Sequence, residues 1–143
     1  IPTTNPSLVD NPLKNISEIK ISEYMKSFTE INFKNSANSI IDLANSANLY
    51  LNDRAPWKLI KDLSNKDIVA NDIYSVLETC RIIAILLNPF VPNLSIRILK
   101  QLKVDPSSIT FEKSLQWGLL NPINGLQNPN PVMDKIEYSE SFI

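Results

Sequence analysis

The chain lacks histidine altogether and has a single cysteine, Cys80. One cysteine cannot form a disulfide within the chain, and without histidine there are too few thiolate or imidazole ligands for a zinc site. The absence of histidine also removes the most common general base and the Ser/His and Cys/His arrangements of nucleophilic catalysis. Because the carboxylates are scattered without a paired spacing, the sequence predicts no catalytic residue, no metal site and no cofactor for this chain.

An excess of charge is also missing, since 14 Lys and Arg balance 15 Asp and Glu and the formal net charge is −1. This balance gives no overall attraction to nucleic acid or to an anionic membrane, so an RNA-binding surface has to be local. The longest apolar run, residues 82–87, is far shorter than the roughly 20 residues that span a bilayer. With neither an initial methionine nor a signal segment, the chain is interpreted as a soluble fragment of a longer protein that has no contact with membranes.

Helical periodicity is what the chain does contain. Residues 1–18, with three prolines, are expected to form an extended N-terminal segment. Apolar residues at spacings of three and four then predict a helix over residues 19–51. Asp53 is a candidate N-cap for a short helix over residues 57–63, with Pro56 near its first turn.

Two further helices are predicted, over residues 67–87 and 94–102. The inward stripe of the first comprises Ile73, Val76, Leu77, Cys80, Ile83, Ala84 and Leu87. No alternating strand pattern is present, so the fold class is all-α. We expect a helical bundle over residues 19–104 and an irregular C-terminal arm, residues 105–143, that contains both glycines and packs on the bundle.

Three stretches resemble the C-terminal anticodon-binding domain of methionyl-tRNA synthetases, which are class I aminoacyl-tRNA synthetases. They are residues 47–57 (ANLYLNDRAPW), residues 77–92 (LETCRIIAILLNPFVP) and residues 130–137 (NPVMDKIE) together with Trp117 and Gly125. The second motif is shared by several class I synthetases, whereas the Pro-Trp pair and the closing arm narrow the resemblance to the methionine enzymes. Val-Met at positions 132 and 133 departs from the family's Leu-Phe.

Such enzymes charge a tRNA with methionine using ATP and Mg, in a catalytic domain with His-Ile-Gly-His and Lys-Met-Ser-Lys-Ser signatures that this chain lacks. The resemblance therefore implies a module that reads the CAU anticodon of a methionine or initiator tRNA and performs no adenylation. Its partners are that tRNA and an absent N-terminal catalytic domain, in the cytoplasm or an organellar matrix or stroma. The family also reads the anticodon with an Asn and an Arg from an upstream helix, to which no residue here corresponds.

Trp57 is the main candidate for RNA contact, because an unstacked base can lie on a flat aromatic surface beside cations that tolerate the phosphates. Arg54, Lys58 and Lys61 fall at i, i+4 and i+7 and are predicted to form a basic stripe beside it. The spacing is equally compatible with Trp57 and Ile60 plugging the junction between two helices. Both interpretations stay open on the sequence alone.

Asn48 is the second candidate for RNA contact, because it matches a family position and its amide can pair with a base edge. Pro56 is the remaining candidate RNA-binding residue. Alternatively, Asn48 and Asn52 could end or cap the helix. Glu78 and Arg81, at i and i+3 on one long helix, predict an ion pair or a backbone-directed hydrogen bond that fixes how the helices meet, although Arg81 could instead face the absent catalytic domain. The competing functions are the anticodon domain of a leucine, isoleucine, valine or cysteine synthetase, and a structural or protein-interaction bundle.

Overall fold

The computed structural model describes residues 11–121, 126 and 128–134, and this part of the chain is all-α as predicted. Predictions for residues 1–10, 122–125, 127 and 135–143, including Gly125 and the end of the closing motif, lie outside the described residues. None of the described helices is both long and apolar enough to cross a membrane. The elements are α1 (Pro12–Thr29), α2 (Phe33–Arg54), α3 (Pro56–Leu59), η2 (Leu63–Asn65), α4 (Lys66–Leu87), α5 (Pro92–Gln101), η3 (Pro106–Ser108) and α6 (Phe111–Ser114).

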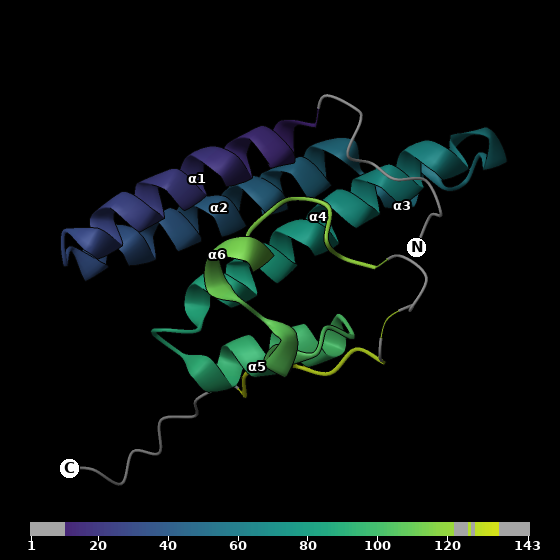
Figure 1. Ribbon diagram of the computed structural model, residues 1–143. Coiled ribbons are helices and arrows are strands. Elements are labelled where there is room, and N and C mark those ends of the chain that lie inside the picture. Colours follow the sequence, from purple (N-terminus) through teal and green to yellow (C-terminus); the bar gives the residue numbers. More distant parts are fainter. Residues whose placement is uncertain (1–10, 122–125, 127, 135–143) are drawn as a thin grey trace, which may run out of the picture.

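The long helices α1 and α2 form a hairpin that packs on α4, while α5 packs on α4 away from the hairpin and α6 also contacts α4 (Figure 1). Helix α4 therefore lies at the centre of the molecule, which explains why its last turns are apolar on most sides. The main core cluster is made of Tyr24, Ile40, Leu43, Ile82, Ala84, Ile85, Leu86, Leu99 and Leu115.

The first helix begins at Pro12, so the prediction of an extended segment is wrong for residues 12–18. Asn11 caps this helix: its side-chain oxygen accepts hydrogen bonds from the backbone N–H groups of Leu13 at 2.9 Å and Lys14 at 3.4 Å. Pro12 occupies the first helical position, where a missing N–H costs nothing. Pro12 was counted among the three prolines of an extended segment, although Asn followed by Pro also favours a helix start.

The helix predicted over residues 19–51 is in fact two helices separated at residues 30–32. Ile31 adopts a left-handed conformation with φ of 59°. The N–H of Ile31 donates to the carbonyl of Phe28 at 3.1 Å, and that of Asn32 donates to the carbonyl of Ser27 at 2.8 Å. This pair of bonds is the Schellman arrangement that ends a helix. Asn32 then begins α2 by accepting a hydrogen bond from the N–H of Asn35 at 3.2 Å.

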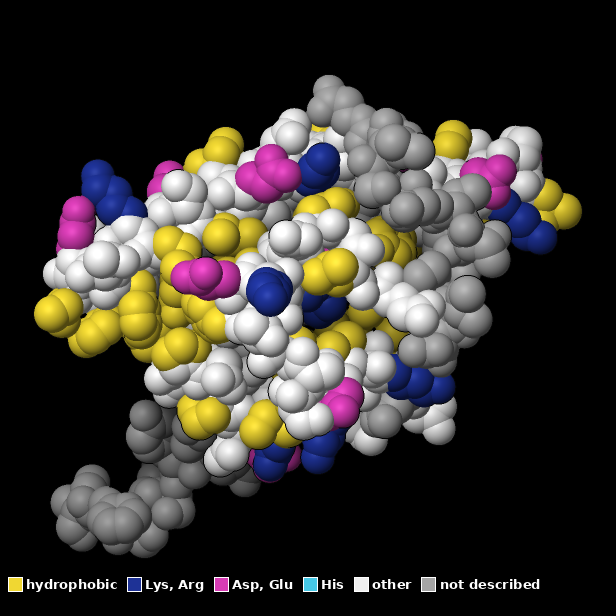
Figure 2. Space-filling view, viewed as in Figure 1, with side chains coloured by type: hydrophobic (Ala, Val, Ile, Leu, Met, Phe, Trp, Pro, Cys, Tyr) yellow, Lys and Arg dark blue, Asp and Glu magenta, His cyan; other side chains and the backbone are white. Residues whose placement is uncertain are grey.

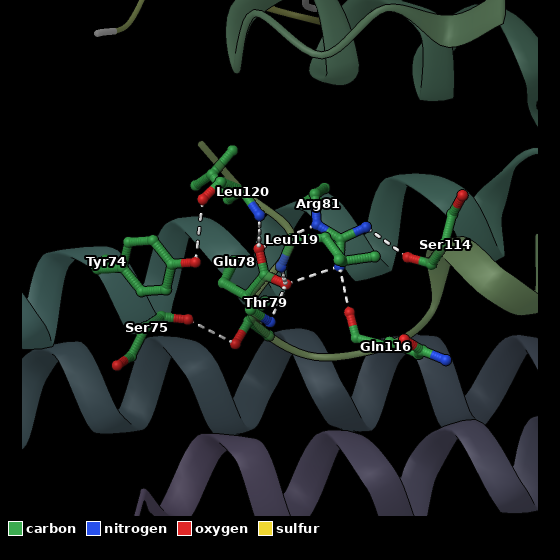
Figure 3. A network of polar contacts seen from close by, with 10 residues as sticks. Tyr74, Ser75, Glu78, Thr79, Arg81, Ser114, Gln116, Leu119 and Leu120 are labelled. Carbon is green, nitrogen blue, oxygen red and sulfur yellow. Dashed lines mark hydrogen bonds and ion pairs between the residues drawn. The ribbon is translucent and has the colours of Figure 1, made fainter. Parts of the chain in front are cut away.

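The buried face of α4 differs from the apolar stripe predicted for it, because it combines Ile82, Ile85 and Leu86 with a set of buried polar side chains. Of that predicted stripe only Ala84 is fully buried, whereas Asp72, Ser75, Glu78, Thr79 and Arg81 are all at most 3% exposed. Figure 3 shows part of this network. Buried polar groups of this kind require partners. Residues 114–120 supply them for Glu78 and Arg81, whereas Asp72 is bonded to Tyr50 and Arg54 of α2.

Glu78 and Arg81 form the predicted ion pair, and both side chains are buried. Arg81 Nη2 lies 2.6 Å from Glu78 Oε1, and Arg81 also donates to the backbone carbonyls of Ser114 and Gln116. The Glu78 carboxylate accepts the backbone N–H groups of residues 118–120 at 2.8–3.1 Å (Figure 3). The alternative that Arg81 faces an absent domain is therefore wrong, because its guanidinium is turned inward.

In α5 and its C-cap, Leu99 and Leu102 are buried, Leu94 and Ile98 are partly buried, and Arg97 and Lys100 are exposed. Beyond it, residues 105–121 include η3 and α6 and return along α4, where the Tyr74 hydroxyl donates to the carbonyl of Leu120 at 3.0 Å. A later part of the chain lies along α5, because Arg97 donates to the carbonyl of Val132 and Gln101 to that of Asn130.

Candidate nucleic-acid interface

The sharp joint between α2 and α3 is formed by Ala55. Its φ of 42° and ψ of 57° are left-handed, and its N–H donates to the carbonyl of Leu51 at 3.0 Å. Its own carbonyl accepts the N–H of Lys58 at 2.8 Å, so the same residue closes one helix and begins the next. The N-cap of α3 is thus Ala55 and not Asp53 as predicted. Pro56 occupies the first position of α3, as expected, and is buried.

Trp57 directly follows this buried proline and is 51% exposed. This exposure does not fit the interpretation in which Trp57 plugs the junction between two helices. The neighbouring Ile60 is also exposed, at 46%. An indole held on a short helix whose preceding residue is anchored in the protein is suited to stacking with a planar partner from solvent.

The predicted basic stripe is not continuous, and this part of the prediction is wrong. A stripe from Arg54 to Lys61 requires one uninterrupted helix, but the left-handed Ala55 breaks it and α3 ends at Leu59. Lys58 and Lys61 are exposed in the structure. On the face drawn in Figure 2, Lys and Arg side chains are scattered and do not form one broad basic patch.

Arg54 is held in a cluster with two other side chains. Its Nε donates to both carboxylate oxygens of Asp72, each at 3.0 Å, and the Tyr50 hydroxyl donates to Asp72 Oδ1 at 2.7 Å. Burial, and then the hydrogen bond to Asp72, raise the pKa of Tyr50 to about 12, so its hydroxyl keeps the proton it donates. The hydrogen bond to Asp72 likewise raises the pKa of Arg54. Asp72 was missed because its partners lie 18 and 22 residues away in the sequence.

Comparison with known proteins identifies the family. Residues 3–141 match the family described as the anticodon binding domain of methionyl tRNA ligase. The chain belongs to this family. The resemblance seen in the three sequence motifs is thereby confirmed.

This anticodon-binding domain is also similar to methionine–tRNA ligases from several organisms. It is 33% identical over 138 residues to that of Synechocystis sp., and 30% identical over 130 residues to the chloroplastic/mitochondrial enzyme of Arabidopsis thaliana. It is 36% identical over 107 residues to that of Rickettsia prowazekii. These matches cover 90%, 88% and 75% of this chain but 26%, 21% and 20% of the relatives. The domain therefore spans about a quarter of the length of the relatives it matches.

Asn48 and Asn52 of the anticodon-binding domain are both exposed on α2. Ala55 provides the cap at the end of that helix, so neither asparagine has the capping role that was the alternative. Asn48 lies on the same helix as Arg54, two turns before its end. The Asn48 side chain is therefore exposed on the part of α2 that precedes the α2–α3 joint.

Within the described ranges of the anticodon-binding domain, no three or more Cys, Asp or Glu side chains are grouped so that they could hold a metal ion. Burial raises the pKa of the Cys80 thiol, which suppresses the reactive thiolate form. Cys80 packs beside Tyr74, Leu102 and Leu120, as expected for a small core residue. The exposed groups around the α2–α3 joint are suited to binding, through stacking, hydrogen bonds and positive charge.

Proposed function

We propose that this anticodon-binding domain reads the CAU anticodon of a methionine or initiator tRNA, with Trp57 as the platform for one unstacked base. The observation that carries the proposal is the 51% exposure of Trp57 directly after the buried Pro56. Stacking of a base on an aromatic side chain stabilises a complex by about 1–3 kcal/mol. A single well-held indole can therefore change RNA affinity by roughly 5- to 150-fold.

The other predicted residues have complementary roles in this proposal. Lys58 and Lys61 are exposed cations that neutralise backbone phosphates, which adds affinity but no sequence preference. Asn48 offers an amide with both a donor and an acceptor for a base edge. Arg54 is 44% exposed at its side chain even while its Nε is bonded to Asp72, so the guanidinium remains accessible to RNA.

The parent protein in this proposal is a methionine–tRNA ligase, which charges tRNA with methionine using ATP and Mg. The support is that the similar proteins carry this name and that the match covers only 26% and 21% of their length. The tRNA-charging chemistry belongs to an N-terminal catalytic domain, which is the second partner of this chain. The cellular site is the cytoplasm or an organellar matrix or stroma, since one relative is named chloroplastic/mitochondrial.

The decisive experiment compares an anticodon stem-loop carrying CAU with the same stem-loop carrying GAU, at low and moderate salt. We expect the wild-type chain to prefer CAU. Trp57→Ala should weaken CAU binding by roughly 5- to 150-fold, the equivalent of losing about 1–3 kcal/mol of stacking. Trp57→Phe should retain part of the affinity, because the smaller ring still offers an aromatic face.

Trp117→Phe is the matched control, because Trp117 is partly buried against the core and should not affect RNA binding. If Trp57→Ala leaves CAU affinity unchanged, Trp57 is not the platform. If a chain shown to be helical by circular dichroism prefers GAU, the domain belongs to a different anticodon specificity. If it binds neither loop, it does not read the anticodon by itself, as the structural-bundle alternative requires.

A further inference from the structure

Asp72 links the last turn of α2 to α4 through one buried carboxylate. It is 3% exposed and accepts the Tyr50 hydroxyl at 2.7 Å and the Arg54 Nε at 3.0 Å on each oxygen. Tyr50 and Arg54 are four residues apart and therefore lie on the same face of α2. Both side chains of that helical turn are thus fixed to a single acceptor on the neighbouring helix.

This attachment lies directly before the candidate platform. Arg54 is the last residue of α2, and it is followed by the left-handed Ala55, the buried Pro56 and then Trp57. The dihedral angles of Ala55 are constrained, and proline fixes its own φ near −65°. With few free dihedrals between Arg54 and Trp57, the orientation of the last α2 turn determines the direction in which α3 presents the Trp57 side chain.

We infer that Asp72 is a positioning residue for anticodon recognition, which fixes the direction in which α3 presents Trp57 and holds the Arg54 guanidinium beside the joint. The inference rests on the proposed function. An unpaired buried carboxylate is costly, so Asp72 keeps Tyr50 and Arg54 in place even without RNA. Such a preorganised platform loses less conformational freedom on binding than a mobile one does.

A merely stabilising role for Asp72 predicts different results, and the chain offers a matched control for it. Glu78, another buried carboxylate of α4, pairs with Arg81 and with the backbone of residues 118–120. Removing its charge should lower stability without altering the α2–α3 joint. Asp72→Asn keeps the side-chain shape but removes the negative charge that pairs with Arg54. It also replaces one of the two oxygens that accept the Arg54 Nε by an amide donor, while the other oxygen can still accept the Tyr50 hydroxyl.

The experiment uses the Trp117→Phe background, in which Trp57 is the sole tryptophan. Time-resolved fluorescence anisotropy of Trp57 in the free chain and the ratio of CAU to GAU stem-loop affinity are measured at a temperature at which every variant is folded. For Asp72→Asn we expect faster local motion of the indole and a CAU/GAU ratio lowered about tenfold. Glu78→Gln should lower the unfolding temperature but leave both readouts unchanged, and Asp72→Glu should restore part of each.

If Asp72→Asn lowers only the unfolding temperature, the role of Asp72 is structural and the inference is overturned. It is equally overturned if the affinity ratio falls while the indole motion is unchanged, because the effect then does not pass through the platform. If the indole loosens in a chain that never preferred CAU, the positioning role stands and the proposed function fails. Should Asp72→Asn not fold, Tyr50→Phe replaces it, with smaller shifts in the same directions expected and unchanged readouts overturning the inference.

Discussion

Glu78 and Arg81 are buried together at the centre of the molecule, at 0% and 2% exposure. Their other hydrogen bonds come from outside the pair: the carboxylate accepts three backbone N–H groups, and the guanidinium donates to two backbone carbonyls. A buried ion pair of this kind contributes little net stability compared with an apolar replacement, but losing one partner leaves a buried charge uncompensated. The two residues therefore also tie the chain after α6 to the bundle.

We expect Arg81→Met and Glu78→Gln each to lower the free energy of unfolding by about 3–5 kcal/mol. The double variant should be destabilised by less than the sum of the two, because it leaves neither charge alone. Urea unfolding followed by circular dichroism measures all three values. Strict additivity would mean that the two side chains do not depend on each other.

At the scale of elements, several helices end without the glycine that usually occupies the left-handed position after the last helical turn. The whole chain has only two glycines. Left-handed positions are instead occupied by Ile31, Ala55 and Lys103, with φ of 59°, 42° and 55°. Each marks the end of a helix, and each side chain has a Cβ that is disfavoured in this conformation by roughly 1–2 kcal/mol.

Ile31→Gly should raise the stability of the chain by about 1 kcal/mol. Glycine removes the steric cost at φ of 59°. Part of the gain in stability is lost, because glycine has more conformational freedom in the unfolded state. Little burial is lost, because Ile31 is 74% exposed. Thermal unfolding tests this, with Ile31→Val as the matched control that keeps the branched Cβ and should change nothing. A less stable glycine variant would show that the Ile31 side chain makes a stabilising contact.

At the scale of the whole molecule, RNA binding has to be local because the net charge is −1. Long-range attraction to a polyanion is weak under such a balance. The exposed Lys58 and Lys61 then supply the electrostatic part of the affinity at short range. The dependence of affinity on salt should accordingly be shallow.

With about two phosphates neutralised, the logarithm of CAU stem-loop affinity should fall with the logarithm of salt concentration with a slope of about −1.4. Lys58→Gln should reduce the steepness by about 0.7 and weaken CAU and GAU loops equally. Lys34→Gln is the control, since Lys34 is exposed at the start of α2, about 30 Å along the helix from Arg54 and beyond the screening length. An unchanged slope in Lys58→Gln would remove Lys58 from the interface.

The sequence by itself determined the all-α class, the family and the two helices found at Lys66–Leu87 and Pro92–Gln101, whose predicted ends differ by at most two residues. The class and the two helices depend on local signals, namely apolar spacing and proline positions, whereas the family was indicated by the resemblance of the three motifs. Trp57 could be selected in the same way, because the Pro-Trp pair is contiguous.

Only the tertiary structure decided the features that depend on partners distant in the sequence. The break at Ile31 was missed because no glycine or proline marks it. The hydrogen bond from Asn11 to Ser75, which joins the start of α1 to α4, could not be foreseen either. Asp72 and Glu78 could not be recognised as buried groups before their partners were known. A polar side chain is buried only where other elements satisfy its hydrogen bonds, and that condition is set by the packing of the whole fold.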